Sequence, residues 1–364
     1  MKKFNICVYA ITKNEEKFVK RWYESMKEAD EIYVLDTGST DKTVEILQSL
    51  GVNVVVKEIK PWRFDVARNE SLALVPDDCD ICVCTDLDEV FEKGWRKELE
   101  AIWGDNTRVR YNYNWSFDKN NRPAVNFYIE KIHDRKNYEW KNPVHEILVC
   151  HGEEKAITTD KITLNHYPDA SKSRGSYLPL LELSVKEDPE NDRNMHYLGR
   201  EYMYYERYNE CIDTLIKHLG LKSATWKDER SASMRFIARS YSNLKRIEEA
   251  RMWYKKAIEE TPYLREPLVE LAMLEHDQAN YEEVIKYLTK ALQITDKYKS
   301  YINEPWCWDQ TIDDLLSIAY FHTEEYDKAL FHVNQALKID KNDTRLKNNK
   351  KLMEKAKNGK NIKK

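Results

Sequence analysis

The chain has 364 residues, of which 41% are hydrophobic and 34% charged, so its composition indicates a folded protein long enough for two domains. A net charge of −4 argues against a general nucleic-acid binder, which usually has a basic surface. No run reaches the roughly 18 apolar residues of a membrane helix, and residues 1–4 lead directly into a predicted strand. We therefore expect a cytoplasmic protein with no membrane span and no secretory leader.

The first half of the chain alternates short apolar runs with helical patterns. Strands are predicted at residues 6–11, 32–35, 52–56 and 81–84, and helices at residues 15–27 and 41–50. Such alternation indicates βαβ units and a mainly parallel sheet, in which ligands bind at the carboxyl ends of the strands. Polar residues follow three of these strands directly, at 12–15, 36–39 and 86–89.

Residues 111–167 are rich in predicted strands and aromatic side chains. Tyr111, Tyr113 and Trp115 alternate with asparagines, which predicts one aromatic face and one polar face. We expect most of these rings, and Trp140, to be core residues, with any exposed ring a candidate for stacking on a ligand. Cys79, Cys82 and Cys84 are expected to be buried free thiols, because no second cysteine cluster completes a zinc site.

From about residue 188 the chain is helical and repetitive. Small residues recur at similar places in four copies: Gly199, Ala238, Ala272 and Ser317, followed twelve residues later by Cys211, Ala250, Val284 and Ala329. The pattern is similar to the tetratricopeptide repeat, whose stacked helix pairs form a concave surface that commonly holds a peptide or partner domain. The alternative is that the repeats only form a homodimer or cap the N-terminal domain. The lysine-rich end is predicted to be a solvated tail.

The strongest chemical signal is the pair Asp86 and Asp88 after the buried fourth strand. Mg²⁺ and Mn²⁺ prefer such oxygen ligands, and a bound cation can stabilise a diphosphate leaving group. An isolated Asp-x-Asp is weak evidence, since carboxylates at strand ends are often solvated. Asp36 also ends a strand, and it is not explained by helix capping, whereas Thr12 and Glu15 have the spacing of a capping box.

Four motifs occur in the order and spacing typical of family-2 glycosyltransferases with the GT-A fold, at residues 11–16, 36–43, 64–72 and 86–89. The chain resembles that family from residue 5 to about residue 170. It looks most similar to the branch with C-terminal tetratricopeptide repeats, which shows a Val-His-Glu motif (residues 144–146 here) and a later histidine (His166 here). Some members of that branch glycosylate ribosomally made peptides.

The resemblance implies a fold and a domain organisation. It implies a GT-A α/β domain with a Rossmann-like mixed sheet, followed by all-α tetratricopeptide-like repeats. We expect the catalytic domain at residues 1–175, a linker at 176–190, repeats at 191–345 and the lysine-rich tail at 346–364.

The resemblance also implies residue roles. The nucleotide-sugar pocket would be lined by Thr12, Asn14, Glu15, Asp36, Asp41, Arg68 and Asp86. Asp86, Asp88 and His166 would be the metal-site residues for Mn²⁺ or Mg²⁺, with Asp88 the direct ligand. Glu146 is the first candidate for the base that activates the acceptor and His145 the second; Asp65 and Glu89 are in reserve. Asp41 also has a purely structural interpretation as a helix cap, and Arg68 as a surface residue.

The predicted reaction is inverting transfer of a hexose or N-acetylhexosamine from a nucleotide diphosphate sugar, with UDP favoured, to a peptide or protein. Transfer to a cell-surface glycan or a lipid-linked sugar is the alternative within the same class. A non-catalytic scaffold that senses nucleotide sugars and a nucleotidyltransferase are alternatives of other classes.

Overall fold

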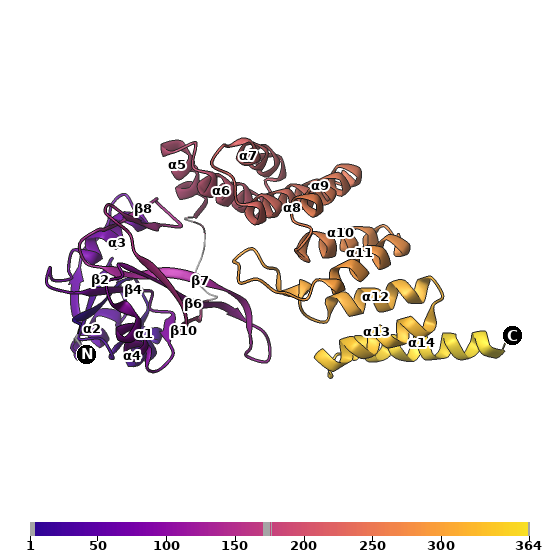
Figure 1. Ribbon diagram of the computed structural model, residues 1–364, viewed down its shortest axis with the longest axis horizontal. Coiled ribbons are helices and arrows are strands. Elements are labelled where there is room, and N and C mark those ends of the chain that lie inside the picture. The colour runs from indigo at the N-terminus through magenta and orange to yellow at the C-terminus, as the bar shows by residue number, and fades with distance from the viewer. Residues whose placement is uncertain (1–3, 170–174, 176, 363–364) are drawn as a thin grey trace. The chain divides into compact units, whose positions relative to one another are not determined.

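The computed structural model describes residues 4–169, 175 and 177–362, with side chains to residue 359. The chain divides into two units, shown in Figure 1: unit 1 comprises residues 1–187 and 299–301, and unit 2 comprises residues 188–298 and 302–364. Within the described residues, no helix has both the length and the apolar character needed to cross a membrane.

Unit 1 is an α/β domain. Its strands are β1 (Ile6–Thr12), β2 (Glu31–Asp36), β3 (Asn53–Val56), β4 (Ile81–Thr85), β5 (Glu89–Phe91), β6 (Arg108–Phe117), β7 (Pro123–Asp134), β8 (Tyr138–Lys141), β9 (Ile147–Cys150) and β10 (Ala156–His166). Its helices are α1 (Glu16–Met26), α2 (Thr43–Ser49), α3 (Phe64–Leu72), α4 (Trp95–Trp103) and α5 (Tyr177–Glu187).

The main sheet is mixed, with strand order β3-β2-β1-β4-β7-β6-β10-β5. Strands β1 to β4 are parallel to one another, as the βαβ pattern predicts, and β7 joins β4 antiparallel. The order reverses between β1 and β4, where α/β proteins bind their ligands. The GT-A-like mixed sheet predicted from the resemblance is confirmed.

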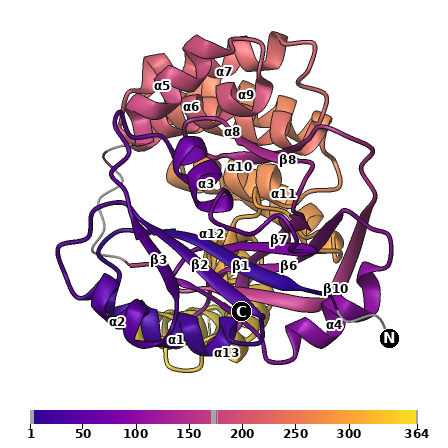
Figure 2. The ribbon, with the colours of Figure 1, turned by 90° about the vertical axis from the view of Figure 1, so that its left-hand side faces the viewer.

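Alternating side chains of β1 pack in two different hydrophobic cores, one on each face of the sheet. Ile6, Val8 and Ala10 pack with residues of α1, α2 and α4, whereas Cys7 and Tyr9 pack with residues of α3, β8 and β9. Figure 2 shows the corresponding layers, with α1, α2 and α4 on one face of the sheet and α3 on the other. The fully hydrophobic β1 is therefore explained by burial on both faces. Cys79, Cys82 and Cys84 are buried free thiols, as expected.

A buried polar chain links three strands of unit 1. The Trp140 indole N–H donates to the Tyr9 hydroxyl at 2.8 Å, and that hydroxyl lies 2.7 Å from His133 Nε2. Because Tyr9 has one proton to donate, it donates to Nε2, and His133 is the Nδ1–H tautomer that donates to the Asp134 carbonyl at 2.6 Å. Burial lowers the pKa of His133 to about 4, which keeps the ring neutral.

Several predicted boundaries were wrong. The linker expected at 176–190 contains helix α5, grouped with unit 1, whose apolar side chains Leu178, Leu180 and Leu181 are buried. The predicted domain boundary borders residues 170–174 and 176, which lie outside the described residues. Helix α2 begins at Thr43 rather than residue 41, and α1 begins after Glu15 with no side-chain cap bond, so the capping box is absent.

Unit 2 consists of paired helices. They are α6 (Asp192–Tyr204), α7 (Tyr208–Gly220), α8 (Lys227–Asn243), α9 (Ile247–Glu260), α10 (Glu266–Asp277), α11 (Tyr281–Gln293), α12 (Thr311–His322), α13 (Tyr326–Ile339) and α14 (Thr344–Ile362), with a short 3₁₀ helix η1 (Pro305–Cys307). The recurring small residues of the sequence pattern are buried in α6 to α13, which confirms the helical repeat.

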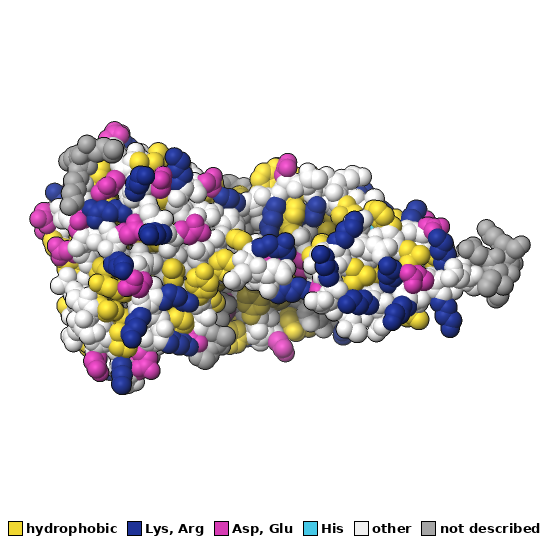
Figure 3. Space-filling model, turned by 90° about the horizontal axis from the view of Figure 1, so that it is seen from below, with side chains coloured by type: hydrophobic (Ala, Val, Ile, Leu, Met, Phe, Trp, Pro, Cys, Tyr) yellow, Lys and Arg dark blue, Asp and Glu magenta, His cyan; other side chains and the backbone are white. Residues whose placement is uncertain are grey.

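The lysine-rich tail is not fully solvated. It forms most of α14, and Leu346 and Met353 on this helix belong to the repeat core. On the face shown in Figure 3, dark blue Lys and Arg side chains gather toward the C-terminal end of the chain. Leu346 and Met353 therefore attach the helix to the repeat core, whereas the lysines whose side chains are described are exposed or half-buried.

The first repeat depends on a close helix approach at Gly199. A Cβ atom at this position would lie 2.3 Å from Leu215 Cδ2, and Leu215 is itself fully buried, so little room for adjustment exists. We expect Gly199→Ala to destabilise unit 2 by about 1–3 kcal/mol through overpacking.

A matched glycine tests this explanation. Gly220 ends α7 and has open space around the position of its missing Cβ, so Gly220→Ala should change stability by less than about 1 kcal/mol. Urea unfolding followed by helical circular dichroism compares the two variants. Equal stability of both variants would contradict the packing argument.

Candidate functional site

The polar residues predicted to form a site gather at the carboxyl ends of β1, β2 and β4. The parallel register pairs Thr12 with Asp36, and Asp86 directly follows β4. The structure thus brings together, at the reversal of strand order, residues that are up to about 75 positions apart.

The loops after β1 and β2 are hydrogen-bonded to each other. Asn14 N–H donates to Ser39 Oγ at 2.7 Å, and Asn14 Oδ1 accepts from Thr40 N–H at 2.7 Å. The Glu15 amide donates to Thr43 Oγ1 at 2.7 Å. Asn14 has a positive φ of 55°, a conformation that asparagine tolerates better than most residues. Asn14 therefore shapes the loop.

Asp41 forms further hydrogen bonds that link the same two loops. Its carboxylate accepts hydrogen bonds from the Thr43 hydroxyl at 2.6 Å and from the Glu16 amide at 3.2 Å. Burial opposes ionisation, but these hydrogen bonds lower the pKa of Asp41 below its usual value. The structural interpretation of Asp41 is thus supported by its contacts.

Asp36 is buried, and its carboxylate is hydrogen-bonded within its own loop rather than to a helix end. Its Oδ1 accepts from the Gly38 and Ser39 amides at 3.0 and 2.8 Å, and its Oδ2 accepts from the Ser39 hydroxyl. Thr12 differs, because its buried Oγ1 has no hydrogen-bond partner among the described residues. A buried hydroxyl without a partner at a ligand-binding edge fits contact with a ligand.

Arg68 is the centre of the charged site. Its guanidinium is almost fully buried, and it contacts Asp86 Oδ1 through Nη2 at 2.7 Å and Glu146 Oε1 through Nε at 2.9 Å. Nη1 lies 3.5 Å from the Cys84 sulfur. Burial opposes the charge, yet the neighbouring carboxylates hold the pKa of Arg68 well above its usual range. The surface interpretation of Arg68 was wrong.

Lys131 is a site residue that the sequence did not reveal. It lies on β7 and places Nζ 2.9 Å from Asp86 Oδ2 and 3.0 Å from Glu89 Oε1. Glu89 Oε1 also accepts from the Tyr113 hydroxyl at 2.8 Å. Burial would lower the pKa of Lys131, but Asp86 and Glu89 hold it well above its usual range. Conversely, Arg68 and Lys131 overcome burial and keep the pKa of Asp86 far below its usual value.

Asp88 and His166 form a second pair beside this network. Pairing of β5 with β10 brings them together, with Asp88 Oδ2 3.4 Å from His166 Nε2. His166 Nδ1 lies 3.0 Å from the Trp115 carbonyl oxygen and must donate to it, so Nε2 is directed at Asp88. Burial lowers the pKa of His166, but Asp88 raises it above its usual value overall.

This pair fits a divalent cation. A carboxylate oxygen and an imidazole nitrogen face each other, and the opposite ring nitrogen is anchored by a carbonyl, as is usual for metal-binding histidines. Asp86 fits direct ligation less well, because both of its oxygens contact cations from the chain. The indole of Trp115 stacks on His166 at 4.4 Å and is 46% exposed, so it offers an aromatic surface next to the pair.

The two candidates for the base differ in environment. Glu146 is 13% exposed in its side chain and bound to Arg68, so it lies in the charged site. His145 has a positive φ of 51°, and its ring lies edge-on to Tyr177 of α5 at 5.9 Å. Glu146 thus contacts the charged site directly, whereas the ring of His145 contacts Tyr177.

Other candidate residues have structural contacts. Asp65 is buried and pairs with Arg63 at 2.8 Å. Tyr111, Tyr113 and Trp140 are buried, as expected for core residues, whereas Trp115 is exposed. Asp65 and the buried rings are therefore less accessible to a substrate than Trp115 is.

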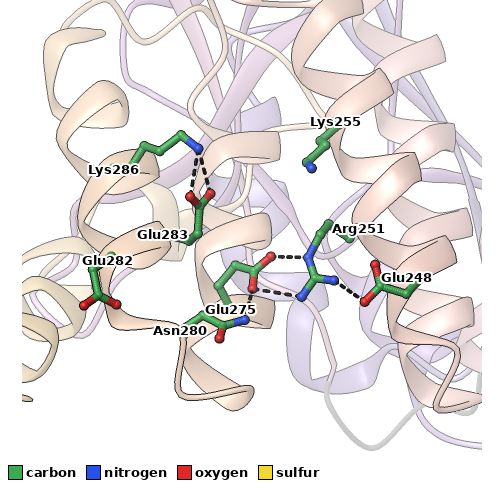
Figure 4. A pocket seen from close by; sticks show the side chains of 8 residues that line it. All are labelled: Glu248, Arg251, Lys255, Glu275, Asn280, Glu282, Glu283 and Lys286. Carbon is green, nitrogen blue, oxygen red and sulfur yellow. Dashed lines mark hydrogen bonds and ion pairs between the residues drawn. The ribbon is translucent and has the colours of Figure 1, made fainter.

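Unit 2 has a charged hollow of about 580 Å³ on α9, α10 and α11. Figure 4 shows that its side chains largely pair with one another: Arg251 contacts Glu248 and Glu275, and Lys286 contacts Glu283. Lining residues of both signs are thus already neutralised within the chain. The hollow offers less to a charged ligand than the site of unit 1.

The sheet and its polar edge define a class of protein, the α/β domains that bind nucleotides where the strand order reverses. Comparison of the sequence with protein-family models then identifies the family. Residues 7–155 match the model described as glycosyl transferase family 2, and residues 236–263 match a tetratricopeptide repeat model. The chain therefore carries a family-2 glycosyltransferase domain followed by tetratricopeptide repeats.

Two bacterial relatives agree with this assignment. A Rickettsia bellii (strain RML369-C) protein described as an uncharacterized glycosyltransferase is 40% identical over 107 residues, which are 29% of this chain and 35% of that protein. The lipopolysaccharide core biosynthesis glycosyltransferase LpsC of Rhizobium meliloti (strain 1021) is 26% identical over 165 residues, 41% of this chain and 59% of that protein. The chain thus spans about a third of the length of the Rickettsia bellii relative.

Solved structures resemble the chain over about half its length. The APC/C hetero-tetramer Cut9-Hcn1 covers 50% of this chain and 33% of the other, with 18% identity and a TM-score of 0.40.

Proposed function

We propose that this protein is a cytoplasmic, metal-dependent, inverting glycosyltransferase that moves a hexose or N-acetylhexosamine from a nucleotide diphosphate sugar. The observation that carries the proposal is the network of Asp86, Arg68 and Lys131 beside the Asp88–His166 pair, at the ligand-binding edge of a family-2 domain. The preference for UDP rests only on its frequency in the family.

In this proposal the nucleotide contacts the edge formed by β1 and β2. Thr12 supplies its unpaired hydroxyl, and Asp36, Asn14, Glu15 and Asp41 hold the loop conformation that surrounds it. Asp88 and His166 hold Mn²⁺ or Mg²⁺, which when bound would stabilise negative charge on the departing diphosphate. Arg68 and Lys131 hold Asp86 in place by pairing with its two carboxylate oxygens.

Glu146 acts as the base in this proposal. Its carboxylate lies in the same ion network as Asp86 and is partly exposed, so an acceptor hydroxyl or thiol can reach it. His145 is the second candidate for the base. Trp115 offers a face on which a sugar or acceptor side chain can stack.

We propose a peptide or protein as the acceptor, bound with the help of the repeats. Tetratricopeptide arrays commonly bind extended peptides, which supports this choice. A cell-surface glycan acceptor is the second candidate, because the relative LpsC is named for lipopolysaccharide core biosynthesis. Separate assays with a peptide library and with core oligosaccharides distinguish the two acceptors.

The donor can be found by thermal unfolding of the full chain with nucleotide sugars, in Mn²⁺, in Mg²⁺ or in EDTA. A ligand that binds only the native state raises the melting temperature, here by about 5 °C near saturation. We expect one donor to give this shift with metal and much less in EDTA. The absence of any shift and any donor turnover would contradict the proposal, and a shift without turnover would support the sensing scaffold instead.

A further inference from the structure

A cluster of side chains of the types that ligate metals lies in unit 2, where the first helix pair meets α8. Asp192 is the first residue of α6, His218 is near the end of α7, and Glu229 is in the first turn of α8. One ligand atom from each of the three side chains lies within 4.8 Å of the other two. His218 and Glu229 are buried.

Two buried histidine rings contact one serine. The hydroxyl of Ser233 lies 2.7 Å from Nδ1 of His196 and 3.0 Å from Nδ1 of His218. A hydroxyl can accept as well as donate, so it can accept a hydrogen bond from an Nδ1–H of His218. In that tautomer Ser233 anchors Nδ1 of His218, and Nε2 is the nitrogen nearer Glu229.

The Nδ1–H tautomer, which a metal ion on Nε2 requires, leaves that nitrogen with a lone pair. The atom is buried, has no hydrogen-bond partner, and lies 3.6 Å from Glu229 Oε1. An ionised carboxylate also has only lone pairs to offer. Two carboxylates and this nitrogen thus converge at one point, and a cation between them would offset the repulsion between the carboxylates.

We propose that Asp192, His218 and Glu229 bind a divalent transition-metal ion, with Zn²⁺ the best fit. Two carboxylates and a neutral imidazole carry a charge that balances a divalent cation, and zinc accepts both oxygen and imidazole ligands. The anchored Nδ1 resembles the outer contact that commonly orients metal-binding histidines. The site is separate from the Asp88–His166 pair, which belongs to unit 1.

The ion has a structural role in this proposal. Its three ligands come from three successive helices, so binding cross-links α6, α7 and α8 at the start of the repeat array. Terminal repeats have a neighbour on one side only and rely on additional stabilisation. Metal binding to the folded form alone is expected to raise the stability of this repeat.

The test uses the full chain with Asp88→Asn as background, which removes the proposed metal site of unit 1. The protein is dialysed against EDTA, loaded with Zn²⁺, desalted and analysed for metal content and thermal unfolding by circular dichroism. We expect about one zinc per chain and a rise in melting temperature of about 5–10 °C. Glu229→Gln and Asp192→Asn, which preserve side-chain size, should each lose most of the zinc and of the temperature rise.

A matched histidine controls for non-specific binding. His276 also lies 3.6 Å from a carboxylate, that of Asp277, but both side chains are partly exposed, so His276→Gln should retain the zinc. The proposal is overturned if the background protein holds no zinc, or if Glu229→Gln and Asp192→Asn retain it. It is also overturned if Glu229→Gln lowers stability but zinc does not raise that of the background protein, since a proton would then hold the cluster together.

Discussion

Replacing Asp88 by asparagine is expected to reduce sugar transfer by roughly 10³-fold or more while leaving the protein folded. The amide has the size of the carboxylate but lacks the charge that attracts a divalent cation. The side chain is 22% exposed and faces His166 at 3.4 Å, so the change removes one of the two groups that fit the ion. Release of nucleoside diphosphate from the donor identified by thermal unfolding measures the loss.

An exposed aspartate provides the control. Asp77 is 94% exposed in its side chain, and Asp77→Asn makes the same chemical change without touching the site. Its activity should match that of the unmodified protein. If Asp88→Asn retained full turnover at unchanged metal dependence, the assignment of Asp88 to the metal site would be wrong.

Replacing Arg68 by methionine should destabilise unit 1 by about 3–5 kcal/mol and abolish donor turnover. The guanidinium is 4% exposed and lies between Asp86 and Glu146, so its removal leaves two carboxylates without their shared cation. Arg68→Lys restores the charge but not both directed contacts, and it should recover only part of the stability. Urea unfolding followed by tryptophan fluorescence measures both variants.

Arg122 provides a control that separates the effect of burial from the effect of losing an ion pair. It pairs with Asp118 at 2.9 Å but is 65% exposed, so Arg122→Met should change stability by less than about 1 kcal/mol. Adding Glu146→Gln to Arg68→Met should recover some of the loss, because one unpaired carboxylate is removed. Equal unfolding midpoints for Arg68→Met and Arg122→Met would refute the role of Arg68 as the centre of the network.

Local patterns in the sequence were sufficient to predict the parallel strands and the positions of the site residues along them. Each of the strands β1, β2 and β4 is a short apolar run followed at once by a polar residue, so both the strand and the edge where its ligand groups lie can be read from neighbouring positions. The repeats were visible for a similar reason, since small residues recur where helices approach closely.

Features that depend on distant pairing could not be predicted in this way. Lys131 reaches Asp86 only because β7 pairs antiparallel with β4. No local sequence pattern predicts which strand pairs with the free side of β4. The partners of Asp36 depend on the conformation of the loop at Gly38, which has a φ of 105°. Helix α5 was not predicted either, and it lies inside the segment expected to be a linker.

The hydrogen bonds between the loops after β1 and β2 have a consequence for engineering the preference for a nucleotide-sugar donor. Asn14, Glu15 and Glu16 on one loop exchange hydrogen bonds with residues 39–43 on the other, so neither loop holds its conformation independently. Swapping one segment alone from another transferase would break these contacts at both ends. A chimera that transplants residues 12–16 together with residues 36–43 retains the whole set, so the two loops form the smallest exchangeable module for altering the nucleotide.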